Sequence, residues 1–257
     1  MNTKAPSAPR VPPSSTELQF QYGHGTETSY VLNVDGRIQK SRQYVATLPP
    51  GSKILDIGCA DGSILGPFSK THELHGVDCH EEYTQMAFVR NNMKGVVHDI
   101  SAAPLPYADG EFDGVFSGET IEHQVDTDWF LAEVNRVLKI GGTFVLTMPN
   151  VRTMLSLGMM VLLDMPPKFS ARYRGPHYRD FTLKLGKIAL QNHGFEIQKY
   201  TGGNIHIPGL GPTASGLASL FPSWADTIIF LAVKRATKPY SLEEASNTDV
   251  YGLFGPG

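Results

Sequence analysis

Short apolar segments alternate with longer segments of helical periodicity along this chain of 257 residues. The apolar segments are predicted strands at residues 54–57, 74–77, 96–97, 114–117, 143–147, 195–200 and 227–233. Segment 128–138 is a predicted helix, because its apolar residues recur every three or four positions, and Gly141-Gly142 is expected to end it before the next strand. This alternation predicts an α/β fold with a doubly wound sheet.

The first predicted strand runs into an acidic, glycine-containing turn, in the stretch KILDIGCADG at residues 53–62. The apolar residues of segment 54–57 are typical of a parallel strand that is covered on both faces. Gly58 and Gly62 allow a tight turn and a close approach of the backbone to a ligand. We therefore expect a binding site at the end of this strand, and a helix from about Ser63.

The charge of this turn argues against a bound dinucleotide. A dinucleotide-binding turn usually reads GxGxxG and places a pyrophosphate at a helix N-terminus. Here Ala60 stands at the second glycine position, and Asp56 and Asp61 already carry negative charge. The turn therefore favours a cationic or zwitterionic ligand, and a nucleotide-dependent oxidoreductase is a disfavoured alternative.

Acidic residues also follow the second and third predicted strands. Ligands of open α/β sheets bind beyond the carboxyl ends of the strands. Asp78 lies twenty residues after Gly58, where a carboxylate can accept both hydroxyls of a ribose. Asp99 follows the third strand, where it can accept the amino group of an adenine, with Ile100 beside the ring. The alternative for Asp78 is a helix-capping role.

Two stretches of the chain carry a resemblance to a known family. Residues 53–62 resemble motif I of class I S-adenosylmethionine-dependent methyltransferases, whose cofactor has a sulfonium, an ammonium and no phosphate. Residues 105–150 read LPYADGEFDGVFSGETIEHQVDTDWFLAEVNRVLKIGGTFVLTMPN and are similar to the second half of the common methyltransferase domain. Its usual form is LPF-D-x-FD-x-V, E-x-x-EH, RVLKPGG and a strand ending in TPN. Ala60 replaces the usual glycine, and Ile140 the usual proline.

The resemblance covers roughly residues 40–150. It implies a Rossmann-like, seven-stranded, mostly parallel sheet with helices on both faces and an antiparallel last strand. It also implies S-adenosylmethionine as the cofactor, held by Asp56, Gly58, Cys59, Ala60, Asp61, Gly62, Asp78, Cys79, Asp99, Ile100 and Ser117. Tyr22, Tyr30 or Arg42 is a candidate to close over it. For the two cysteines we expect small side chains that line a cavity, with no redox or metal role.

Three residues are candidates for acceptor chemistry. Glu119 follows the fourth strand, and His123 comes four residues later, on the same face if the intervening turn is helical. His177 lies in GPHYRDFT, which resembles a stretch before a late helix in methyltransferases from glycan-modifying clusters. A hydroxyl acceptor gains from a base, whereas an amine can bind neutral. The alternatives are that Glu119 and Glu122 merely favour a helix N-terminus, and that His123 is a packing residue.

Residues 151–181 are expected to form the acceptor pocket of a methyltransferase domain at 17–237. The apolar part at 154–165 is predicted to be a pocket-capping helix or, alternatively, an interfacial one. The part that follows gathers Lys168, Arg172, Tyr173, Arg174, Tyr178 and Arg179, which favours a phosphate or carboxylate on the acceptor, unless it is a solvated loop. Residues 1–16 are expected to be a disordered leader and 238–257 a flexible tail.

The predicted function is methyl transfer to a small polar acceptor, with a hydroxyl of a sugar, nucleotide sugar or lipid-linked glycan favoured. N-methylation of an amine or phosphate ester, O-methylation of a quinone-like phenol, and cofactor binding without catalysis are the alternatives. The net charge of -3 and the absence of an Asn-Pro-Pro-Tyr motif after the fourth strand argue against a nucleic acid partner. No metal site is expected. No run is long enough to span a bilayer, and the N-terminus lacks the apolar core of a secretory signal, so a cytoplasmic location is predicted. Peripheral contact with a membrane is the alternative role for residues 154–165.

Overall fold

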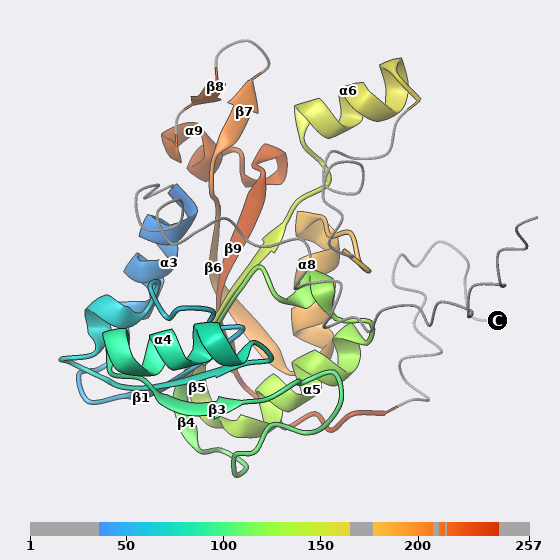
Figure 1. Ribbon diagram of the computed structural model, residues 1–257. Coiled ribbons are helices and arrows are strands. Elements are labelled where there is room, and N and C mark those ends of the chain that lie inside the picture. Colours follow the sequence, from blue (N-terminus) through green and yellow to red (C-terminus); the bar gives the residue numbers. More distant parts are fainter. Residues whose placement is uncertain (1–35, 165–176, 208–210, 214, 242–257) are drawn as a thin grey trace, which may run out of the picture.

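The computed structural model describes residues 36–164, 177–207, 211–213 and 215–241 (Figure 1). The described strands are β1 (Lys53–Ile57), β2 (Glu73–Asp78), β3 (Lys94–Val97), β4 (Phe112–Gly118), β5 (Leu138–Pro149), β6 (Phe195–Gly202), β7 (Ile205–Ile207), β8 (Gly211–Thr213) and β9 (Thr227–Lys234). The described helices are α3 (Gly36–Val45), α4 (Glu81–Asn91), α5 (Thr127–Val137), α6 (Met154–Leu162), α8 (Leu183–Asn192) and α9 (Ser215–Leu220). Three 3-10 turns, η1 (Gly66–Phe68), η2 (Ile121–His123) and η3 (Pro222–Trp224), complete the described elements.

Seven strands form one sheet in the order β3-β2-β1-β4-β5-β9-β6. The pairs among β1 to β5 are parallel, and β9 is antiparallel to both β5 and β6. The strand order reverses between β1 and β4, which is where ligands bind in open sheets of this kind. The predicted fold class, with its antiparallel last strand, is confirmed.

Helices cover both faces of this sheet (Figure 1). On one face, Val45 of α3 and Ala87 of α4 pack into a buried apolar cluster with the sheet. On the other face, the core residues of α5 and α8, such as Phe130 and Leu190, join a larger cluster. The covering of both faces explains why the central strands are apolar at successive positions rather than at alternate ones.

The helix expected from about Ser63 is absent, which corrects that prediction. The chain forms turns there and only the 3-10 segment η1. The side chain of Arg42 donates to the carbonyl oxygens of Ser63 and Ile64 at 2.9 Å each, which stabilises the turns. Pro67 also lacks the N–H group that would donate to the carbonyl oxygen of Ser63 in an α-helix.

Gly141-Gly142 does not end a helix, which is a second correction. Helix α5 already ends at Val137, and the glycines lie within the span of β5. Gly141 has a φ of 80° and sits where the pairing of β4 with β5 shifts register. The glycines therefore permit an irregularity in the strand.

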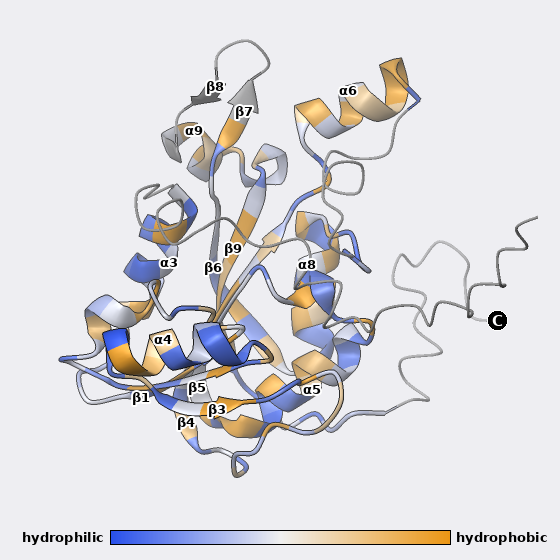
Figure 2. Ribbon diagram, viewed as in Figure 1, coloured by the Kyte–Doolittle hydropathy of each residue, from blue (hydrophilic) through white to orange (hydrophobic). Residues whose placement is uncertain are grey.

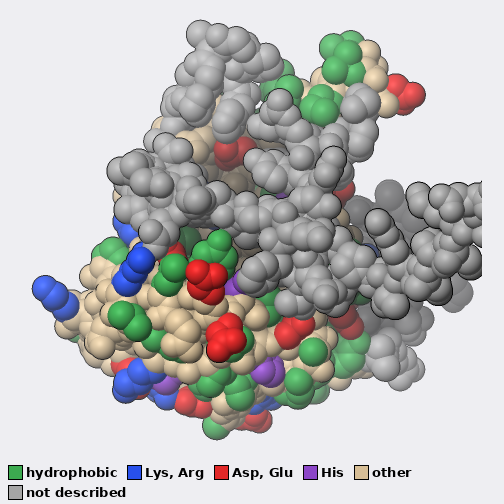
Figure 3. Space-filling model, viewed as in Figure 1, with side chains coloured by type: hydrophobic (Ala, Val, Ile, Leu, Met, Phe, Trp, Pro, Cys, Tyr) green, Lys and Arg blue, Asp and Glu red, His purple; other side chains and the backbone are tan. Residues whose placement is uncertain are grey.

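Helix α6 projects from the sheet at the end where the hairpin of β7 and β8 also lies (Figure 1). It is hydrophobic along most of its length (Figure 2). Val161, Leu162 and Leu163 at its end are 79%, 80% and 66% exposed, so this apolar segment does not pack into the core (Figure 3). In the described part of the chain, no helix is long and apolar enough to cross a membrane.

Candidate functional site

The turn after β1 is held against the end of β4. Gly58, Ala60 and Gly62 have φ values of 76°, 44° and 71°, in the left-handed region that favours glycine. A Cβ on Gly58 would lie 2.3 Å from Oγ1 of Thr120, so only glycine fits there. The hydroxyls of Ser117 and Thr120 both donate to the carbonyl oxygen of Ile57, at 3.1 and 3.2 Å. The ends of these two strands are thus fixed side by side.

Asp78 lies at the end of β2 beside this turn. Its two carboxylate oxygens accept hydrogen bonds from the backbone amides of Ala60 and His80, at 2.9 Å each. The carboxylate therefore fixes the turn and remains at the sheet edge where a ribose is expected. Asp99 is also at this edge, and its Oδ1 accepts from the amide and hydroxyl of Ser101 at 2.9 and 2.6 Å.

Asp56 is the deepest of the acidic residues around this turn. It is 2% exposed, and its Oδ1 has no hydrogen-bond partner in the described part of the chain. Burial, and then the negative charges of Asp78 and Asp61, raise the pKa of Asp56 well above its usual value. A cluster of this charge, with no basic residue shown to pair with Asp56, suits a cationic ligand and not a pyrophosphate.

The two cysteines lie beside the same turn and are both free thiols. Burial raises the pKa of Cys59 well above its usual value, and burial followed by the charges of Asp78 and Asp99 raises the pKa of Cys79 to about 12. Both thiols are therefore protonated and weakly nucleophilic at neutral pH. A Cβ on Gly76 would lie 2.9 Å from Sγ of Cys59, so the sulfur fills space in the core.

The acceptor-side candidates begin where β4 ends. Glu119 adopts a φ of 53°, unusual for a residue with a side chain, and its amide donates to the carbonyl and the hydroxyl oxygen of Thr147. The hydroxyl of Thr147 donates to Oε1 of Glu119 at 3.0 Å. Strained backbone of this kind persists only where the surroundings fix it, and it is common at functional sites.

His177 lies next to His123, although the two are far apart in the sequence. The segment before Phe181 runs along the end of β5 through a parallel bridge between Asn150 and Phe181. The amide of Tyr178 donates to the carbonyl oxygen of Glu122 at 2.8 Å. As a result the rings of His123 and His177 are 4.8 Å apart and nearly perpendicular, at 88°.

Glu122 is the residue at this site that sequence reasoning missed. It is 1% exposed, and its Oε2 has no hydrogen-bond partner in the described part of the chain. Burial, and then the charge of Glu119, raise the pKa of Glu122 well above its usual value, while Arg37 opposes the shift. The sequence placed Glu122 beside His123, but nothing in the pattern marked it as buried.

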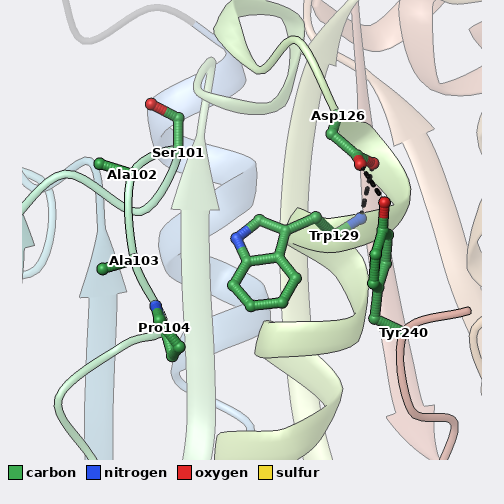
Figure 4. A pocket seen from close by; sticks show the side chains of 7 residues that line it. All are labelled: Ser101, Ala102, Ala103, Pro104, Asp126, Trp129 and Tyr240. Atoms are coloured by element: carbon green, nitrogen blue, oxygen red, sulfur yellow. Dashed lines mark hydrogen bonds between the residues drawn. The ribbon is translucent and has the colours of Figure 1, made fainter. Parts of the chain in front are cut away.

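A pocket of about 310 Å³ opens beside the end of β3 (Figure 4). Its lining residues are Ser101, Ala102, Ala103, Pro104, Asp126, Trp129 and Tyr240. The indole of Trp129 donates to the carbonyl oxygen of Ile100 at 2.9 Å, and Tyr240 donates to Asp126 at 2.6 Å. The lining residues include neither the turn after β1 nor His123, and through Trp129 the pocket adjoins Ile100, the expected adenine contact.

The structure describes only some of the remaining candidate residues. Lys168, Arg172, Tyr173 and Arg174 lie outside the described residues, as do Tyr22, Tyr30, the leader at 1–16 and the tail from 242 onward. Arg179 donates to the carbonyl oxygen of Val125 at 3.2 Å, close to η2. Arg42 donates to the carbonyl oxygens of Ser63 and Ile64, just after the turn that follows β1, and its closure over the cofactor stays a prediction.

Comparison with known proteins identifies the domain in which these residues lie. Residues 55–146 match the family described as a methyltransferase domain. This part of the chain is a class I S-adenosylmethionine-dependent methyltransferase domain. This domain takes S-adenosylmethionine as its cofactor, and the acidic, cation-compatible turn fits that group. A possible histamine N-methyltransferase from Thermotoga maritima shares the fold, with a TM-score of 0.59, 17% identity, and 85% of this chain and 99% of that one covered.

Curated relatives of this methyltransferase domain differ in their acceptors. A ubiquinone biosynthesis O-methyltransferase of Mesorhizobium japonicum is 30% identical, over 44% of this chain and 46% of the relative. A dimethylglycine N-methyltransferase of Parasynechococcus marenigrum is 31% identical, over 44% of this chain and 43% of the relative. The chain thus spans less than half the length of these relatives. The matched domain does not identify the acceptor of this chain.

Proposed function

We propose that this protein is a methyltransferase that uses S-adenosylmethionine to methylate a hydroxyl group of a small polar acceptor. The observation that carries this proposal is the contact between the rings of His123 and His177 just beyond the end of β4, where Glu119 also lies. Three groups able to accept or hold a proton therefore stand at the carboxyl edge of the sheet, beside the expected cofactor position.

The residues around the turn bind and orient the cofactor in this proposal. Asp78 accepts from the ribose, Asp99 and Ile100 contact the adenine, and the charges of Asp56 and Asp61 favour the cationic part. When bound, S-adenosylmethionine supplies a methyl group on a positively charged sulfur, whose bond to carbon breaks as the acceptor oxygen bonds to that carbon.

A hydroxyl acceptor must lose its proton during the transfer, and a positioned base contributes roughly 10²- to 10⁴-fold. Burial lowers the pKa of His177, against the opposing charge of Asp180, so its imidazole is neutral at physiological pH and able to accept a proton. His123 lies in edge contact with that ring. The pair therefore supports O-methylation more directly than transfer to an amine, which needs no base.

A sugar, nucleotide sugar or lipid-linked glycan is the favoured acceptor class. Arg179 beside η2 supports an anionic group on the acceptor, together with the basic residues that precede it in the sequence. The exposed apolar end of α6 fits peripheral contact with a membrane. An amine or a quinone-like phenol is the alternative, because the relatives named above include both N- and O-methyltransferases. The cytoplasmic location stays a prediction.

The first test is a calorimetric titration with S-adenosylmethionine and, separately, with NAD. Asp78→Asn is the variant, and Asp109→Asn, in the loop that precedes β4, is the matched control. Loss of one charged hydrogen bond predicts roughly 10- to 150-fold weaker binding of S-adenosylmethionine by Asp78→Asn. Because Asp78 also holds the turn, circular dichroism must show that the variant is folded. Binding of NAD alone would refute the proposal.

The second test measures release of S-adenosylhomocysteine with a panel of sugars, phosphorylated sugars, phenols and amines. Turnover with a hydroxyl acceptor that falls in His177→Gln supports the proposal. Binding of the cofactor with no turnover on any class would favour the other candidate, a cofactor-binding protein without catalysis.

A further inference from the structure

Glu122, His123 and His177 form a cluster of metal-ligating groups at the acceptor side. One ligand atom from each lies within 4.8 Å of the others. His123 Nε2 is 3.8 Å from Glu122 Oε1, and the two imidazole rings meet edge to face. Two residues come from η2 and the third from the segment that ends at Phe181, so the tertiary fold alone assembles the set.

The buried carboxylate of Glu122 is the second observation, independent of this spacing. Its side chain is 1% exposed, and Oε2 has no hydrogen-bond partner in the described part of the chain. A buried carboxylate is normally hydrogen-bonded, paired with a cation or bound to a metal. Hydrogen bonding does not satisfy Oε2, and Glu119 adds more negative charge nearby.

We propose that Glu122, His123 and His177 bind a divalent transition-metal ion, with zinc as the reference ion. Two imidazoles and one carboxylate form a ligand set that suits zinc and other first-row divalent ions. Sites with three protein ligands leave a coordination position open. This inference departs from the sequence expectation that no metal site is present.

The ligand atoms of Glu122, His123 and His177 lie almost as close together as they would around a bound ion. Ligand atoms at about 2.0 to 2.2 Å from one ion lie roughly 3 to 3.5 Å apart. The present separations, up to 4.8 Å, close to that range through small rotations of the side chains. The amide of Tyr178, which donates to the carbonyl oxygen of Glu122, keeps the segment of His177 in place for this.

The role of the ion rests on the proposed function, although the binding of the ion does not. In the open position the ion would hold the acceptor oxygen and favour loss of its proton. His123 and His177 would then act as ligands, and Glu119 would be left as the candidate base. If the protein binds no ion, His123 and His177 remain available as the base described above.

The experiment uses the full chain, stripped with a chelator and titrated with Zn²⁺ by calorimetry and with Co²⁺ by visible absorbance. The variants are Glu122→Gln, His123→Gln and His177→Gln. His72→Gln, which precedes β2 at the opposite edge of the sheet, is the control. We expect a single ion per chain, Co²⁺ bands of a nitrogen- and oxygen-ligated ion, and roughly 10- to 100-fold weaker binding in each of the three variants but not in the control.

Two results would overturn the proposal: no saturable binding of either ion, or binding that the three variants leave unchanged. S-adenosylmethionine is titrated in parallel into the same samples. Intact cofactor binding without metal binding would reject the metal site and leave the proposed function standing. Loss of both in the unsubstituted chain would reject the two together. Retention of cofactor binding by the variants shows that they are folded.

Discussion

Gly58→Ala tests how the turn after β1 is built. The added Cβ would lie 2.3 Å from Oγ1 of Thr120 and 3.0 Å from its Cγ2, and the residue would keep a φ of 76°. A left-handed conformation costs a residue with a side chain roughly 1 to 2 kcal/mol. Overpacking adds about 1 to 3 kcal/mol, so the free energy of unfolding should fall by about 2 to 5 kcal/mol.

The two contributions separate in a double-mutant cycle with Thr120→Ala. That substitution removes both clashing atoms but also a hydroxyl that donates to Ile57, which costs about 1 kcal/mol. The double variant should therefore be more stable than the sum of the single effects predicts, by the overpacking part of about 1 to 3 kcal/mol. The cost of the left-handed backbone conformation, roughly 1 to 2 kcal/mol, should remain in the double variant.

Urea unfolding measures the free energies, and calorimetry measures S-adenosylmethionine affinity in the same variants. We expect Gly58→Ala to weaken cofactor binding and Thr120→Ala to restore part of it. Additivity within about 0.5 kcal/mol would refute the reasoning, because the two residues would then not be in contact as described. A loss in Gly58→Ala below about 0.5 kcal/mol would refute it too.

Two more predictions concern buried polar groups. Because their pKa values are raised, Cys59 and Cys79 should stay protonated and resist a thiol-specific chromogenic disulfide at pH 8. Both thiols should react once urea unfolds the chain. Fast labelling of the native protein would contradict the described burial. Lys234 of β9 donates at 2.6 and 2.8 Å to the carbonyl oxygens of Asn135 and Leu138 at the end of α5. Lys234→Met should therefore lower the free energy of unfolding by roughly 2 to 4 kcal/mol. Lys238→Met, just after β9, is the control. Equal urea midpoints for these two variants would show that the lysine does not cap the helix.

The sequence by itself determined the layers of the fold and the cofactor edge. Apolar segments identified the strands of the main sheet, most clearly the central ones, which are buried on both faces and need continuous apolar runs. The spacing of Asp78 and Asp99 placed carboxylates at strand ends, which a parallel sheet brings to one edge. These features depend on residues that are close together in the chain, so the sequence pattern alone reveals them.

Only the tertiary structure decided which distant residues meet. Arg42 donates to the carbonyl oxygens of Ser63 and Ile64 and stabilises turns where a helix was expected. The bridge between Asn150 and Phe181 brings His177 to His123, and Glu122 is buried beside them. Such contacts depend on packing between segments far apart in the chain, so no periodicity or spacing within one segment encodes them.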